Sequence, residues 1–177
     1  MIPENELDRT SMRPDTGPRG PLAAFYVEVD RWDESSEFAR RVRSLVRAGV
    51  EVSMRCDFDM DELPEIFLPS WVNEEDVLET RRDAELRYAL HRGAEEWAMQ
   101  DLLFSFDPRQ RSWEWWDATQ ASGNVVQIWV DSRGEPVFAC DELRWILYLS
   151  GARSVVGPLL VPLEIWERQQ SVGISSA

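Results

Sequence analysis

The sequence is short of the residues that most often carry chemistry, with no lysine, one histidine and two cysteines among 177 residues. Cys56 and Cys140 lie far apart and form no CxxC pair, so together with His91 they make no familiar zinc-binding set. Nothing in the sequence supports a disulfide between the two cysteines. All 19 cationic residues are arginine, which we attribute to the codon bias of a GC-rich genome.

The common catalytic motifs are also missing. The sequence contains no GxGxxG, no P-loop, no HExxH and no GxSxG. These motifs bind phosphates, hold zinc or position a serine nucleophile, so the corresponding nucleotide-binding, zinc-protease and serine-hydrolase classes lose support. The sequence predicts no cofactor and favours a protein that is not an enzyme.

Long apolar runs are absent as well, and no stretch is long enough to span a membrane as a helix. The first residues include Glu4, Glu6 and Asp8 where a secretory signal would have a basic start followed by an apolar run. We therefore expect a bacterial, cytoplasmic protein.

Negative charge is what the sequence has in excess. With 33 acidic and 19 basic residues, its formal net charge is −14. This charge opposes direct binding to nucleic-acid backbones and to anionic membranes, because like charges repel. It favours solubility or a basic protein partner.

The length and a hydrophobic fraction of 44% predict one globular domain with a substantial core. Residues 1–21 are rich in proline, glycine and charge, so we expect a disordered N-terminal arm. A single α+β domain is predicted over residues 22–170, followed by a flexible tail over residues 171–177.

The most strongly patterned stretch lies in the last third of the chain. Residues 125–130 alternate with the period of two that is typical of a strand. A turn over residues 131–134 should return the chain through a second strand at residues 136–139. A helix capped by Asp141 is predicted to run to about Leu149. Its apolar residues lie on nearly every side, so it should be central and buried.

The N-terminal half predicts a strand that begins near Leu22 and a helix that ends at Gly49. The alternating residues 50–56 then predict a second strand. A helix between two strands is most simply a right-handed parallel crossover. Because both strands have a polar face, helices should cover mainly one side of the sheet. The expected fold is an α+β two-layer sandwich with a mixed sheet of about four or five strands.

A long helical region is expected over residues 74–106, with Gly93 as the point where it would divide into two helices. Residues 109–123 are interpreted as a connector. A last strand is expected at residues 155–161, and Pro158 confines it to an edge of the sheet because proline has no N–H to donate.

The densest group of carboxylates comprises Asp57, Asp59, Asp61 and Glu62. We interpret it as a solvated acidic loop or as an acidic patch for a protein partner. The alternative is a divalent-metal site formed by Asp57, Asp59 and Asp61. An EF-hand is excluded, because Glu62 and Leu68 stand where that loop needs glycine and glutamate.

The most unusual local composition is the tryptophan group of Trp113, Trp115 and Trp116. In an exposed connector these side chains would form an aromatic platform for a ligand or a protein partner. The alternative is that they fill the core between the long helical region and the hairpin.

Cys140 lies where a strand is expected to meet a helix, and a helix N-terminus can stabilise a thiolate. If the fold brought His91 beside it, the two would form a nucleophile and its base. The neighbouring Asp141 and Glu142 oppose a thiolate, so a small buried thiol and an exposed histidine are the favoured interpretation.

These observations predict a non-enzymatic, acidic protein-binding module that engages a basic protein, as an inhibitor, an immunity-type protein or an assembly factor would. Its binding residues would come from the tryptophan group and the acidic cluster. Two alternatives stay open: a small metal-dependent hydrolase-type enzyme that uses the three aspartates, and a small-ligand-binding protein with a tryptophan-lined site.

Overall fold

A computed structural model describes residues 5–73, 75–93 and 97–174 of the chain. It contains a four-stranded sheet whose strand order is β2-β3-β1-β4. The strands are β1 (Leu22–Glu28), β2 (Glu114–Ser122), β3 (Val125–Asp131) and β4 (Ser154–Val161). All the pairings are antiparallel. The α+β class is therefore confirmed, whereas the expected mixed sheet is wrong.

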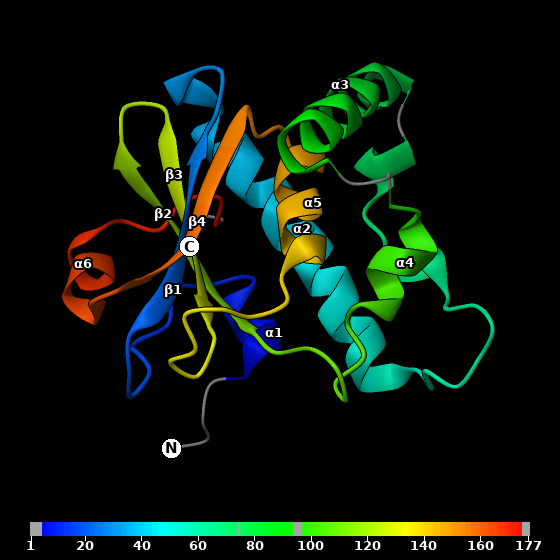
Figure 1. The fold of residues 1–177 in the computed structure, drawn as a ribbon, viewed down its shortest axis with the longest axis horizontal. Helices are drawn as coiled ribbons and strands as arrows, with labels where there is room; N and C mark the ends of the chain where they lie inside the picture. Colours follow the sequence, from blue (N-terminus) through cyan, green and yellow to red (C-terminus); the bar gives the residue numbers. More distant parts are fainter. Residues whose placement is uncertain (1–4, 74, 94–96, 175–177) are drawn as a thin grey trace.

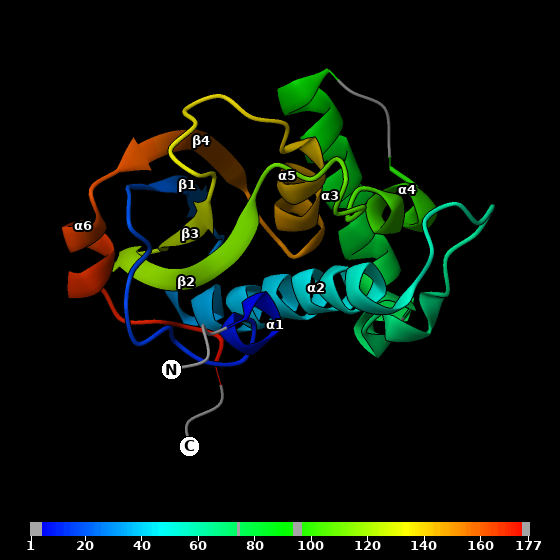
Figure 2. The same ribbon diagram turned by 90° about the horizontal axis from the view of Figure 1, so that it is seen from below.

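Six α-helices accompany the sheet in the described part of the chain. They are α1 (Glu6–Arg9), α2 (Ser35–Arg55), α3 (Glu75–Arg92), α4 (Met99–Phe104), α5 (Asp141–Leu149) and α6 (Leu163–Arg168). Helices α2, α3, α4 and α5 lie on one side of the sheet, and α6 lies on the other (Figures 1 and 2). None of the described helices is long and apolar enough to cross a membrane.

Helix α2 continues through the residues expected to form a second strand. Gly49 lies inside this helix, and a Cβ atom on it would stand 2.4 Å from Cδ2 of Phe106. The glycine therefore serves close packing and does not end the helix. The apolar residues Val42, Val46 and Val52 are all buried, with a spacing that suits one helical face. Without the expected strand there is no parallel crossover, so the sheet is antiparallel.

The hairpin also differs from the prediction. Strand β3 pairs with β2, which precedes it, and most of the expected connector at residues 109–123 is strand β2. The turn over residues 131–134 is present, with positive φ at Arg133 and Gly134. Residues 136–139 nevertheless form no strand and lead directly into α5.

Both ends of the described chain are more ordered than expected. In place of a disordered arm, α1 packs against β2, and Nε of Arg9 donates to the carbonyl of Trp115 at 2.8 Å. In place of a flexible tail, the N–H of Val172 donates to the carbonyl of Ala118 at 2.9 Å. Both segments therefore cover the outer edge of β2. Residues 1–4 and 175–177 lie outside the described residues.

Helix α5 occupies the central position that its sequence predicts. Leu143, Trp145 and Ile146 are all almost completely buried. The residue at the N-cap is Cys140, with no side-chain capping bond, where Asp141 was expected. As predicted, β4 is an edge strand that contains Pro158.

Candidate functional site

The three tryptophans expected to bind a partner are buried. Trp113 is 2% exposed, Trp115 is 0% exposed and Trp116 is 9% exposed. Nε1 of Trp113 donates to Oε1 of Glu142 at 2.5 Å, and Nε1 of Trp115 donates to the carbonyl of Arg9 at 3.1 Å. Side chains enclosed in this way offer no platform to a ligand, and they fit the alternative in which they fill the core.

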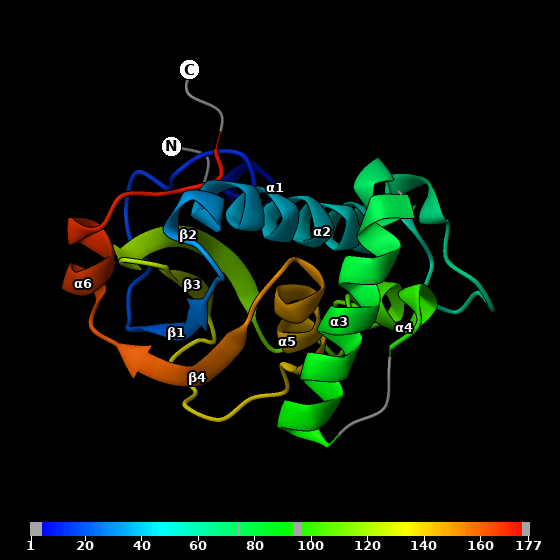
Figure 3. The ribbon, with the colours of Figure 1, turned by 90° about the horizontal axis from the view of Figure 1, so that it is seen from above.

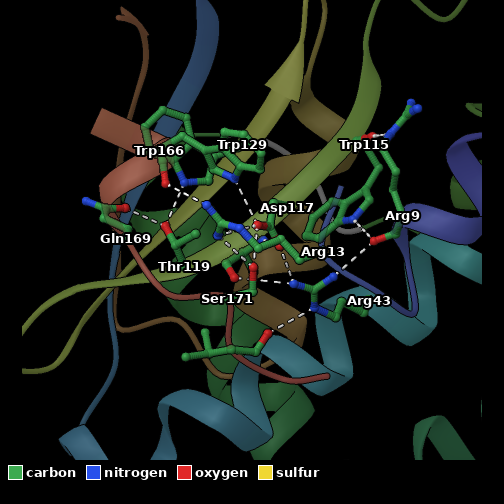
Figure 4. A network of polar contacts seen from close by, with 12 residues as sticks. Arg9, Arg13, Arg43, Trp115, Asp117, Thr119, Trp129, Trp166, Gln169 and Ser171 are labelled. Carbon is green, nitrogen blue, oxygen red and sulfur yellow. Dashed lines mark hydrogen bonds and ion pairs between the residues drawn. The ribbon is translucent and has the colours of Figure 1, made fainter. Parts of the chain in front are cut away.

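Next to them, Asp117 is the centre of an extensive polar network (Figure 4). Its Oδ1 accepts from Nη2 of Arg43 at 2.5 Å, and its Oδ2 accepts from Nε1 of Trp166 at 2.9 Å and from the hydroxyl of Ser171 at 2.6 Å. Nη1 of Arg13 forms an ion pair with Oδ2 of Asp117 at 3.3 Å. Asp117 is fully buried, and burial lowers the pKa of Arg43 while the carboxylate opposes that change.

The Asp117 network joins four parts of the chain: the N-terminal segment, α2, α6 and the C-terminal segment. Both carboxylate oxygens have several partners, so neither is left to act on a substrate. We therefore assign this network a structural role, the attachment of both chain ends to strand β2.

The four carboxylates of the acidic cluster are exposed on the loop after α2, residues 57–62, which we call the acidic loop. Oδ1 of Asp57 accepts from the backbone N–H of Asp59 at 3.0 Å, a local turn contact, and Asp59 pairs with Arg109 at 3.0 Å. Within the described residues there is no group of three or more histidine, cysteine or acidic side chains that could hold a metal ion. The metal-site alternative at Asp57, Asp59 and Asp61 therefore has no support there, and Asp61 and Glu62 are exposed.

Cys140 and His91 do not form a pair. Nδ1 of His91 lies 2.7 Å from the hydroxyl of Tyr148, near the C-terminal end of α5. Cys140 is at the other end of α5, at its N-cap. With a rise of 1.5 Å per residue, the backbone positions of Cys140 and Tyr148 are about 12 Å apart along the helix axis. The thiol is buried, as the favoured interpretation expected.

A different part of the surface has the shape of a binding site. An open cavity of about 650 Å³ lies between α3, α4, the acidic loop and the segment that follows α4. We call it the acidic hollow. Its aromatic lining is Phe58, Tyr88, Trp97 and Phe104, and its carboxylates are Asp101, Asp107 and Asp141. Figure 1 shows α4 at the end of the molecule opposite to α6.

The rim of the acidic hollow already holds one guanidinium group. Nη2 of Arg109 contacts Oδ2 of Asp107 at 2.8 Å, and its Nη1 contacts Oδ1 of Asp59 at 3.0 Å. The hydrogen bond from Arg109 lowers the pKa of Asp107, so this carboxylate stays ionised. Through Arg109 the predicted acidic cluster is thus connected to the acidic hollow.

The aromatic residues of the acidic hollow were not among the predicted binding residues. They come from three separate parts of the chain, and only tertiary packing brings them together around one cavity. Among these aromatic residues, Phe58 is the one that the sequence places next to predicted binding residues, because it stands between Asp57 and Asp59.

The fold and this cavity define an α+β protein with an acidic, aromatic-lined surface hollow. Comparisons of the chain with protein-family models, with characterised proteins and with solved structures gave no match.

Proposed function

We propose that this chain is a non-enzymatic protein-binding module that holds a basic segment of a partner protein in the acidic hollow. The observation that carries the proposal is the combination of aromatic rings and carboxylates in one open cavity. Aromatic faces attract cations, and carboxylates form charge-assisted hydrogen bonds with arginine and lysine. The contact of Arg109 with two carboxylates at the rim shows that the local geometry suits a guanidinium group.

The surroundings of the acidic hollow favour a protein partner over a small cation. Met60 is 56% exposed and Ile66 is 84% exposed, both on the segment that carries the acidic cluster. Exposed apolar side chains on the segment that also contributes Phe58 to the cavity supply contact area for a polypeptide. The net charge of −14 adds long-range attraction for a basic partner.

The proposal is tested with a fluorescein-labelled, arginine-rich peptide and the full-length protein, by fluorescence anisotropy at low and high salt. The variant Asp101→Asn/Asp141→Asn removes two charges from the acidic hollow while keeping oxygen acceptors. The control Glu164→Gln/Glu167→Gln removes two exposed charges from α6, on the other side of the sheet. We expect the hollow variant to raise Kd roughly tenfold, which corresponds to about 1.4 kcal/mol, and the control to change it little.

Two outcomes would overturn the proposal. Equal weakening by both double variants would mean that the peptide senses only net charge, and a glutamate-rich peptide that binds equally well would exclude recognition of cations. If the expected result holds, affinity capture from lysate with the wild-type protein and the two variants will identify the partner. It should be a basic protein retained by the wild type and the α6 control and lost from the hollow variant.

A further inference from the structure

The aromatic residues of the acidic hollow supply a kind of surface that its carboxylates do not. The lining contains Phe58, Tyr88, Trp97 and Phe104. Tyr88 is 1% exposed, whereas the other three are only partly buried. These three come from the acidic loop, from the segment before α4 and from α4 itself. Figure 3 shows α4 at the end of the molecule that lies opposite to α6.

The rings of Phe58 and Phe104 meet at a steep angle. Their centroids are 6.4 Å apart, and their planes are inclined by 73°. Because both rings line the acidic hollow, they form adjoining walls of the cavity and not a flat stack. Trp97 adds a third aromatic side chain to the same cavity. The face of an aromatic ring is electrically negative, so several rings around one cavity attract a cation.

The buried carboxylate of the acidic hollow is already occupied. Asp107 is 4% exposed, and Arg109 donates to it from its backbone N–H, from Nε to each oxygen, and from Nη2. A carboxylate has about four acceptor positions, so these contacts fill it. Asp101 and Asp141, the other two carboxylates of the lining, are exposed to solvent. A cation between the rings would therefore be near negative charge, while the buried carboxylate has no capacity left for its N–H donors.

This arrangement favours a cation without N–H donors. An ammonium or guanidinium group that leaves water needs an acceptor for each donor, and a hydrogen bond that is not replaced is costly. A quaternary ammonium group has no N–H to satisfy, and its methyl groups pack directly on aromatic faces. The aromatic walls and the negative lining therefore suit a quaternary ammonium group better than a primary one.

We propose that the acidic hollow binds a trimethylated lysine side chain of the partner protein, an inference that rests on the proposed function. The trimethylammonium group would lie among the rings of Phe58, Trp97 and Phe104. Basic residues beside it in the partner would approach Asp101 and Asp141. Trimethylation keeps the positive charge of lysine, so the net charge of −14 still attracts the segment. A volume of about 650 Å³ leaves room for residues that flank the modified lysine, which favours a protein over a small amine.

The first experiment uses the full-length protein and a fluorescein-labelled, arginine-rich peptide with one central residue that varies. This residue is lysine, trimethyllysine or the uncharged tert-butyl analogue of trimethyllysine, so length and flanking charge stay the same. In fluorescence anisotropy, we expect trimethylation to lower Kd about tenfold, which a desolvated cation–π contact can supply. The uncharged analogue should lose this gain. Equal binding of the trimethyllysine peptide and either of the other two would overturn the inference.

The second experiment removes one ring at a time from the acidic hollow. Trp97→Leu and Phe58→Leu keep an apolar side chain and remove the aromatic face. The control Trp32→Leu removes an indole that is 73% exposed and does not line the cavity. Each hollow variant should raise Kd severalfold for the trimethyllysine peptide and change it little for the lysine peptide, while the control changes neither. Equal weakening of both peptides by the two hollow variants would overturn recognition by the rings.

Melting temperatures establish that each variant is folded. Because Trp97 also packs against the core, Phe58→Leu on the acidic loop serves as the second, independent variant. Either variant alone suffices for the comparison of the two peptides.

The outcomes separate this inference from the proposed function. If the lysine and trimethyllysine peptides bind equally and Asp101→Asn/Asp141→Asn weakens both, the proposed function holds and the inference fails. If none of the three peptides binds, both fail. Free choline that binds as tightly as the trimethyllysine peptide in isothermal titration would indicate a small quaternary amine as the ligand, and it would overturn the protein source.

Discussion

Arg43 of α2 and Asp117 of β2 form an ion pair at 2.5 Å in which both side chains are almost completely removed from solvent. This pair joins the longest described helix to the sheet (Figure 4). A buried charge that loses its partner is strongly unfavourable, since nothing replaces the solvation that it lost on folding. Loss of either partner should therefore destabilise the fold strongly.

Replacing Asp117 by Asn keeps the side-chain shape and removes the charge that Arg43 and Arg13 face. We expect the free energy of unfolding to fall by about 3–5 kcal/mol, as measured by urea denaturation. The control is Asp33→Asn, which alters an exposed pair with Arg31 and should cost less than about 1 kcal/mol. Similar losses in the two variants would contradict the assignment of Asp117 as the centre of the network.

Gly49→Ala tests the contact between α2 and Phe106. Alanine is favoured over glycine in a helix by about 1 kcal/mol, but its methyl group would stand 2.4 Å from a ring carbon of Phe106. Overpacking of this kind costs about 1–3 kcal/mol, so we expect a net loss of stability in chemical denaturation. Gly20→Ala, with open space around its added Cβ, is the control. A shorter side chain in the double variant Gly49→Ala/Phe106→Leu should recover part of the loss.

Glu142 gives stability a distinct dependence on pH. Burial raises the pKa of this carboxyl above its ordinary value of 4.5, and the hydrogen bond from Trp113 opposes the rise only in part. Between the ordinary and the raised pKa, the folded state binds more protons than the unfolded state. The contribution of Glu142 to stability is therefore greatest below pH 4.5 and falls as the pH rises through this window.

The variant Glu142→Gln keeps an acceptor for Nε1 of Trp113 and does not titrate. Its free energy of unfolding should match that of the wild type in acid and exceed it at neutral pH, as measured by denaturation across this range. Glu164→Gln, at an exposed position of α6, should run parallel to the wild type at every pH. A constant difference between Glu142→Gln and the wild type would show that Glu142 does not cause the pH dependence.

The acidic loop should act on the rate of association. Asp61 and Glu62 are exposed on the loop that contributes Phe58 to the acidic hollow, and they do not line the cavity, so we expect them to attract a basic peptide without holding it. In stopped-flow measurements, Asp61→Asn/Glu62→Gln should slow association severalfold at low salt and leave dissociation nearly unchanged. The difference should vanish at high salt, because salt screens exposed charges. A change confined to dissociation would place these residues in direct contact with the peptide.

Local patterns predicted several elements well. Helix α5 was recognised because its apolar residues occur on all sides, and the edge position of β4 followed from the missing N–H of Pro158. Both properties belong to short stretches of sequence and need no knowledge of the rest of the chain.

The errors arose where a distant contact decides the local structure. Residues 50–56 satisfy both a period of two and the helical spacing that continues from Val42 and Val46. Gly49 suggests the end of a helix when the sequence is taken alone, whereas in the structure it lies inside α2 in close contact with Phe106, far along the chain. In β2, the register shift between Trp115 and Asp117 breaks the alternation that marks a strand.

The candidate sites were the least predictable part. The acidic cluster was visible as a run of carboxylates, but only tertiary packing brings Trp97 and Phe58 together in the acidic hollow. The tryptophan group stood out by composition, and composition does not distinguish a buried indole from an exposed one.

The partners of Asp117 also bear on how the protein is made. Trp166 and Ser171 come from the last elements of the chain, while Arg13 and Arg43 emerge from the ribosome long before them. During synthesis, the sheet and α2 can meet before this network is complete, and the buried ion pair stays open to water until the final segment arrives. Folding of this network therefore waits until the residues up to Ser171 have been synthesised, and chains truncated before α6 would expose an unsatisfied charge and an uncovered strand edge to aggregation.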